Sequence, residues 1–180
     1  AAEANWLLLP YASYAPSTKI AGGLVVGHYR PAPPGTRGSS VVVTLTGTQR
    51  RQLIAEVVPE LYLSDGRWRV QGQVLGSAYP DVFYGIGGDT PAVAETDYTA
   101  HYGTVDLAVQ RRVRSHLRVG PRLFVRTGTV TEVEAETPLA RNRVPGADGG
   151  TNIGVGGSAL WDARSSLYDP RRGTYAEASL

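Results

Sequence analysis

Several short patterns in the chain resemble catalytic or ligand-binding motifs, and each is incomplete. Gly154-x-Gly156-x-x-Ala159 matches a loose dinucleotide-binding fingerprint, but the alternation of a strand runs through it and no helix is expected after it. Ser158 lacks the last glycine of a Gly-x-Ser-x-Gly nucleophile motif. Gly85-Ile-Gly87-Gly88 has the composition of an anion cradle, although a loop turn needs the same glycines.

The titratable side chains form no recognisable metal-binding or acid–base motif. His28, His101 and His116 fall on three different predicted strands, and the chain contains no cysteine. Glu132, Glu134 and Glu136 recur at every second residue, which is typical of a solvated rim, with a loop cation site as the alternative. We therefore predict no catalytic residues, no metal, no cofactor and no enzymatic activity.

The composition and charge pattern indicate one folded domain that neither binds nucleic acid nor crosses a membrane as a helix. The chain has 180 residues, of which 42% are hydrophobic and 19% charged, a balance that fits a single globular or barrel domain over residues 1–180. The 18 basic and 16 acidic residues are interspersed, so no basic stripe for nucleic acid is expected. No apolar run is long enough for a membrane helix, whereas a membrane strand needs only about 9–11 alternating residues.

Alternation of apolar and polar residues is the dominant pattern in the chain. It predicts antiparallel strands, because a period of two fits a strand and not a helix. The strongest predicted strands are 41–50, 67–78, 115–127 and 152–164, with weaker ones at 6–14, 20–30, 52–63 and 97–112 and the start of a ninth at 173–180. Ser64-Asp65-Gly66 predicts a tight hairpin turn, and 31–38, 79–94 and 137–150 predict longer connections.

The two faces of these strands differ in chemistry, and either could meet water. The low lysine content and the aromatic residues near strand ends favour a membrane barrel with its polar face inside. The predicted lumen-facing residues are Arg69, Gln71, Gln73, His116, Arg118, Arg122 and Arg126. The predicted lipid-facing residues are Val41, Val43, Leu45, Val70, Val74, Leu117, Val119, Leu123 and Val125. The predicted interfacial aromatics are Trp6, Trp68, Tyr79, Tyr84 and Trp161.

Two segments resemble those of a known family. Tyr79-Pro-Asp-Val-Phe-Tyr-Gly-Ile-Gly-Gly-Asp-Thr90 with Glu95-Thr-Asp-Tyr-Thr99, and Asp162-Ala-Arg164 with Pro170-Arg-Arg-Gly173-Thr-Tyr175, are similar in type and order to segments of the bacterial surface antigen family, the BamA/TamA-type outer-membrane barrels. Leu9-Pro10-Tyr11 also resembles the first strand of that family. The family's Arg-Gly-aromatic loop motif and its C-terminal aromatic signal are not found, and Ser165 stands where a second acid is common.

The resemblance implies a sixteen-stranded barrel in the bacterial outer membrane that inserts or translocates outer-membrane proteins, and sometimes lipids, without a cofactor. The chain is then expected to be an all-β, antiparallel transmembrane segment of about eight strands, half of that barrel and without periplasmic docking domains. The expected partners are the lipid bilayer, outer-membrane protein clients, and the missing half of the barrel or a second copy. Pro10 is expected to weaken a lateral seam because proline lacks an N–H donor, or simply to sit at a strand edge or bulge.

Two other architectures fit the same alternation. A complete eight-stranded outer-membrane barrel, acting as an anchor, narrow pore or lipid-modifying enzyme, predicts that strand 6–14 pairs with strand 152–164. A soluble β-barrel that carries a hydrophobic ligand predicts that the apolar face, including Val43 and Leu123, forms a core while Arg118, Arg122 and Arg126 face water.

Overall fold

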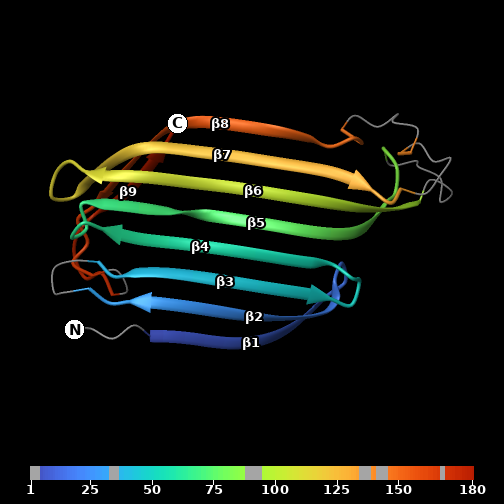
Figure 1. Ribbon diagram of the computed structural model, residues 1–180, viewed down its shortest axis with the longest axis horizontal. Coiled ribbons are helices and arrows are strands. Elements are labelled where there is room, and N and C mark those ends of the chain that lie inside the picture. Colours follow the sequence, from blue (N-terminus) through green and yellow to red (C-terminus); the bar gives the residue numbers. More distant parts are fainter. Residues whose placement is uncertain (1–4, 33–36, 88–94, 134–138, 141–145, 167–168) are drawn as a thin grey trace.

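The computed structural model describes residues 5–32, 37–87, 95–133, 139–140, 146–166 and 169–180, and it contains one antiparallel sheet of nine strands in sequence order (Figure 1). Each strand pairs with the next along the chain. The strands are β1 (Asn5–Ala15), β2 (Lys19–Arg30), β3 (Ser39–Thr48), β4 (Leu53–Leu63), β5 (Trp68–Phe83), β6 (Thr96–Arg112), β7 (Leu117–Thr131), β8 (Gly150–Asp162) and β9 (Tyr175–Ser179). The all-β, antiparallel prediction is therefore confirmed, including the start of a ninth strand.

The tight turn between β4 and β5 forms where the sequence predicted it. Ser64, Asp65 and Gly66 all have positive φ, at 51°, 55° and 73°, and the amide of Arg67 donates to the Ser64 carbonyl at 3.0 Å. Short polar residues and glycine tolerate this left-handed backbone better than other types. The turn fixes the register in which Leu63 faces Trp68.

Two predicted boundaries were wrong. We predicted that residues 79–94 form a connection, but β5 continues to Phe83, because the long strand β6 offers partners from Ala100 to Thr96. We also predicted that His116 lies in a strand facing the lumen. It lies instead in the turn between β6 and β7, because β7 begins at Leu117.

The sheet curls toward its polar face. Gln71 of β5 and Glu177 of β9 both lie on that face, and the Gln71 amide donates to the Glu177 carboxylate at 3.0 Å although three strands separate them in the sheet. Arg37, which precedes β3, contacts Asp162 at the end of β8 at 2.6 Å. In Figure 1, β9 accordingly passes behind the other strands. The polar face is concave and the apolar face convex.

The curl does not close the sheet within the described residues. β1 pairs only with β2, and β8 pairs with β7 and β9. The pairing of 6–14 with 152–164, expected of a complete eight-stranded barrel, is thus not formed. β9 covers only residues 158–162 of β8 by strand pairing, so the sheet has an unpaired edge at each side.

The fold has no second layer beneath its convex face in the part of the chain that the structure describes. The buried hydrophobic side chains are Ala21, Ala100, Ala108, Leu139 and Leu160. The four of these in strands share, by register, the concave face of Arg69 and Arg122. Apolar side chains on the convex face are therefore not packed into a core. No described helix is long and apolar enough to cross a membrane.

Gly120 allows side chains of β6 and β8 to meet above β7. A Cβ at Gly120 would overlap the backbone of Val109 and Gln110 on β6. With glycine there, Ser158 of β8 reaches across, and its hydroxyl accepts from the Gln110 amide at 3.1 Å and donates to the Gly120 carbonyl at 3.2 Å. This glycine is needed for close approach rather than for backbone freedom.

Candidate functional site

The centre of the concave face is a buried network around Arg69. This residue is only 7% exposed, and its guanidinium donates from Nε to Glu60 Oε1 and from Nη1 to Gln110 Oε1, each at 3.0 Å. Tyr62 donates to the same Glu60 oxygen at 2.8 Å. Through Gln110 the network continues to Ser158, so polar side chains from β4, β5, β6 and β8 form one connected group.

A second polar cluster lies farther along the same face. Arg122 makes a two-pronged contact with Asp106, at 2.7 Å from Nε and 2.6 Å from Nη2, and its Nη1 donates to the Ser179 hydroxyl at 2.8 Å. Gln73 donates to Glu56 across β4 and β5. These opposite charges and amides satisfy one another across neighbouring strands, as confined polar groups require.

The third cluster joins the end of β8 to the segment before β3. The Asp162 side chain is 7% exposed and binds Arg164 at 3.0 and 2.9 Å as well as Arg37. The Arg164 guanidinium also lies over the Tyr175 ring, with its central carbon 4.4 Å from the ring centroid. The hydrogen bond with Asp162 raises the pKa of Arg164.

The strand register places the predicted residues on two opposite faces. Arg69, Gln71, Gln73, Arg118, Arg122 and Arg126 all lie on the concave face. All nine of the predicted lipid-facing residues, from Val41 to Val125, lie on the convex face. Contact with a lumen or with lipid remains a prediction for both sets.

No described segment covers the convex face along most of the sheet. Leu8 of β1 is 66% exposed, Leu45 of β3 is 47% exposed and Val155 of β8 is 80% exposed. Exposed apolar residues of this kind occur on β1 to β8, and the register joins them into one surface. Isolated proteins in water rarely expose a contiguous apolar patch of more than a few hundred Å².

The three tryptophans lie on the convex face at one rim of the sheet. They belong to the start of β1, the start of β5 and the end of β8, which all lie at the left of Figure 1. Each has a polar partner: the Trp6 ring lies 4.6 Å from that of His28, Arg111 lies 5.9 Å above Trp68, and His116 contacts the Trp161 ring edge-on at 5.7 Å. Trp161 also donates to the Thr174 hydroxyl at 2.9 Å.

The other two predicted interfacial aromatics, Tyr79 and Tyr84, do not lie in strands on the convex face as the tryptophans do. We expected Tyr79 on the apolar face, but its pairing with Ala100 places it on the concave face with Arg69. This follows from the extension of β5, in which odd-numbered residues from Arg69 onward point the same way. Tyr84 lies beyond the end of β5 and is 64% exposed.

The motif-like patterns of the sequence do not come together into a site among the described residues. Gly154, Gly156 and Ala159 lie within β8. No group of three His, Asp or Glu side chains among the described residues is placed to hold a metal ion. Gly88, Glu134 and Glu136 lie outside the described residues.

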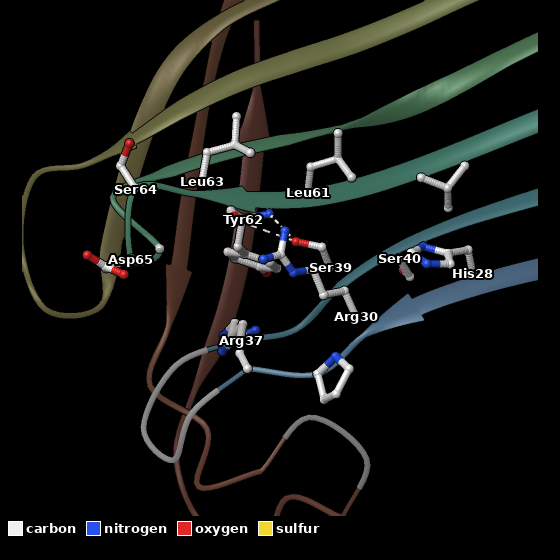
Figure 2. A pocket seen from close by; sticks show the side chains of 14 residues that line it. His28, Arg30, Arg37, Ser39, Ser40, Leu61, Tyr62, Leu63, Ser64 and Asp65 are labelled. Carbon is white, nitrogen blue, oxygen red and sulfur yellow. Dashed lines mark hydrogen bonds between the residues drawn. The ribbon is translucent and has the colours of Figure 1, made fainter. Parts of the chain in front are cut away.

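A cavity lies at the rim of the sheet, between the end of β2, the start of β3 and the turn that joins β4 to β5. Its volume is about 570 Å³, and Arg37, Ser39, Tyr62 and Asp65 are among the residues that line it. Figure 2 shows Ser39 next to Tyr62, whose amide donates to the Ser39 hydroxyl at 2.8 Å. Arg37 also lines a second cavity, of about 420 Å³, on the side of β7 and β8.

Sequence reasoning missed the residues that connect the network. Gln110 and Ser158 are 0% and 6% exposed, yet neither belongs to a recognisable motif. The signal was available for Gln110, which has the same parity as Asp106 in the predicted strand 97–112. Alternation also places Ser158 on the polar face of the predicted strand 152–164, but it gives no sign of the contact across Gly120. Arg37 could not be found in this way, because it lies in a connecting segment.

No family model, curated protein or solved structure matches the chain. The resemblance to the BamA/TamA-type barrels therefore rests on the quoted sequence segments.

Replacing Arg69 with methionine should destabilise the fold strongly. The change leaves the buried Gln110 Oε1 without its donor and Glu60 without its positive charge, so we expect a loss of about 2–4 kcal/mol in the free energy of unfolding. Chemical denaturation followed by tryptophan fluorescence measures this loss. The matched control is Arg171→Met, which breaks an ion pair with Asp169 in which both side chains are mostly exposed and should cost no more than about 1 kcal/mol. Equal effects of the two substitutions would contradict a central role for Arg69.

Proposed function

We propose that this chain forms part of the wall of a transmembrane β-barrel in the bacterial outer membrane. The observation that carries the proposal is the convex apolar face, which runs over β1 to β8 and which no layer of the described residues covers. Hydrocarbon is the environment in which such a face is stable, since each buried Å² of apolar surface contributes about 25 cal/mol. The concave network of charges then lines an aqueous lumen, as in known membrane barrels.

The tryptophan rim supports this membrane proposal. Tryptophan favours the membrane–water interface because its ring is apolar while its N–H needs a polar partner. Trp6, Trp68 and Trp161 all lie on the apolar face, and each ring contacts a histidine or an arginine at the rim. The N–H of Trp161 also donates to the Thr174 hydroxyl. The rim at the left of Figure 1 is thus assigned to one headgroup layer.

We further propose that the barrel acts in the insertion or translocation of outer-membrane proteins, as the resemblance to BamA/TamA-type barrels implies. The unpaired edge of β1 supports this activity. Backbone N–H and C=O groups cannot stay unpaired in lipid, so another strand must cover β1, from the rest of a barrel, a second copy or a client. Pro10 lacks an N–H donor, which weakens strand pairing at this point in β1.

The membrane proposal predicts depth-dependent quenching of tryptophan fluorescence. In vesicles of brominated phosphatidylcholine, bromines near the headgroups should quench Trp6, Trp68 and Trp161 more than bromines near the bilayer centre. Variants that keep one tryptophan and replace the other two with phenylalanine assign the signal to each position. Absence of quenching at every depth would contradict membrane embedding, and strongest quenching by the deepest bromines would contradict the interfacial placement.

The assembly proposal predicts strand-specific cross-links to a client. The chain contains no cysteine, so Leu8→Cys on β1 and Val43→Cys on β3 each introduce a single thiol on the convex face. During insertion into vesicles of an unfolded outer-membrane protein that carries one cysteine in its last strand, we expect disulfide cross-links to Leu8→Cys. The central strand β3 is already paired on both sides, so Val43→Cys should give few. Equal yields at the two positions would contradict pairing at the β1 edge.

A further inference from the structure

Two arginines face each other across neighbouring strands at the concave side of the rim. Arg112 ends β6, and its partner in the register is Arg118 of β7. Like charges directly opposite in a sheet are destabilising. The register places two positive charges side by side, so this pair is electrostatically unfavourable unless a negative charge lies close by.

The carboxylates of the surrounding chain do not neutralise this pair. Asp162 is already bound by Arg37 and Arg164. Among the described residues no ion pair joins Arg112 or Arg118 to an acid, and Arg118 instead donates to the Gly66 carbonyl at 2.8 Å. Its guanidinium also lies 5.3 Å from the centroid of the Tyr62 ring. Arg118 is half-buried, so solvent only partly screens its charge.

Both arginines line a cavity of about 420 Å³ that opens at this rim. The charged lining consists of four arginines and two aspartates, a surplus of two positive charges when His116 is neutral. Gly66 and Ser165 also line the cavity. Guanidinium groups present several N–H donors in a fixed plane, which suits the oxygens of a phosphate group.

We propose that this cavity is a binding site for a phosphate group, free or carried by a lipid headgroup, held between Arg112 and Arg118. A phosphate offers more acceptor oxygens than a carboxylate and a charge of up to two, which matches the surplus of the lining. The position at the rim, where His116 lines the cavity and also contacts Trp161, suits a lipid phosphate. The site stands on the charges of the cavity and does not depend on the proposed assembly activity.

Calorimetric titration of the chain in phosphate-free dodecyl maltoside micelles tests the site. Inorganic phosphate at constant ionic strength should bind saturably, and Arg112→Gln should weaken that binding about tenfold, the effect of losing one charge-assisted contact. The control is Arg111→Gln, which removes the same charge from the adjacent residue, whose side chain lies over Trp68 on the convex face. It should leave the affinity unchanged.

A second titration with phosphatidic acid in mixed micelles identifies the source of the phosphate. Tighter binding than inorganic phosphate, again weakened by Arg112→Gln, assigns the site to a lipid headgroup, whereas equal affinity assigns it to free phosphate.

Without phosphate, the Arg112→Gln variant should unfold at the same or a higher denaturant concentration than the unchanged chain, because a like-charge contact is removed. The proposal is overturned if phosphate does not bind saturably, if both glutamine variants weaken binding equally, or if Arg112→Gln destabilises the phosphate-free chain.

Discussion

A guanidinium group that is removed from water must have its donors matched, and this requirement at Arg69 organises the concave face. Glu60 of β4 and Gln110 of β6 satisfy it from both sides, and Ser158 of β8 extends the contact over Gly120. These side chains come from strands that are not all neighbours, so the sheet must curl for them to meet. The curl brings β9 within hydrogen-bonding reach of β5 and Arg37 within reach of Asp162.

The curl also determines which face of the sheet carries the charged side chains and which carries the exposed apolar ones. Because the charges turn inward and satisfy one another, most of the exposed apolar residues of the strands lie on the outside, where the described chain has nothing to pack on them. A protein core in this position would need a second layer, which the described residues do not supply, and in our proposal lipid takes its place. The same logic explains the tryptophans, which lie where the apolar face ends and polar partners begin.

Strand alternation predicted most of this fold, because apolar and polar residues alternate at every second position in segments such as 115–127. The parity of Arg69, Arg118 and Arg122 also placed them together on one face. What alternation could not predict was the extent of β5, since the gain from pairing with β6 outweighed the turn-forming residues after Ala78. Nor could it predict the contacts of Arg37 and Ser158, which depend on how far the sheet curls and on the space above Gly120.

The placement of the two faces in two media is tested most directly by spin labelling along β7. Labels introduced one at a time at residues 117–127, in the chain reconstituted in bilayers, report collisions with oxygen, which concentrates in lipid, and with a water-soluble nickel chelate. Our account predicts oxygen access at Leu117, Val119, Leu123 and Val125, and nickel access at Arg118, Arg122 and Arg126. Protection of the odd-numbered set from both reagents would contradict it and would point to a protein core on the convex face.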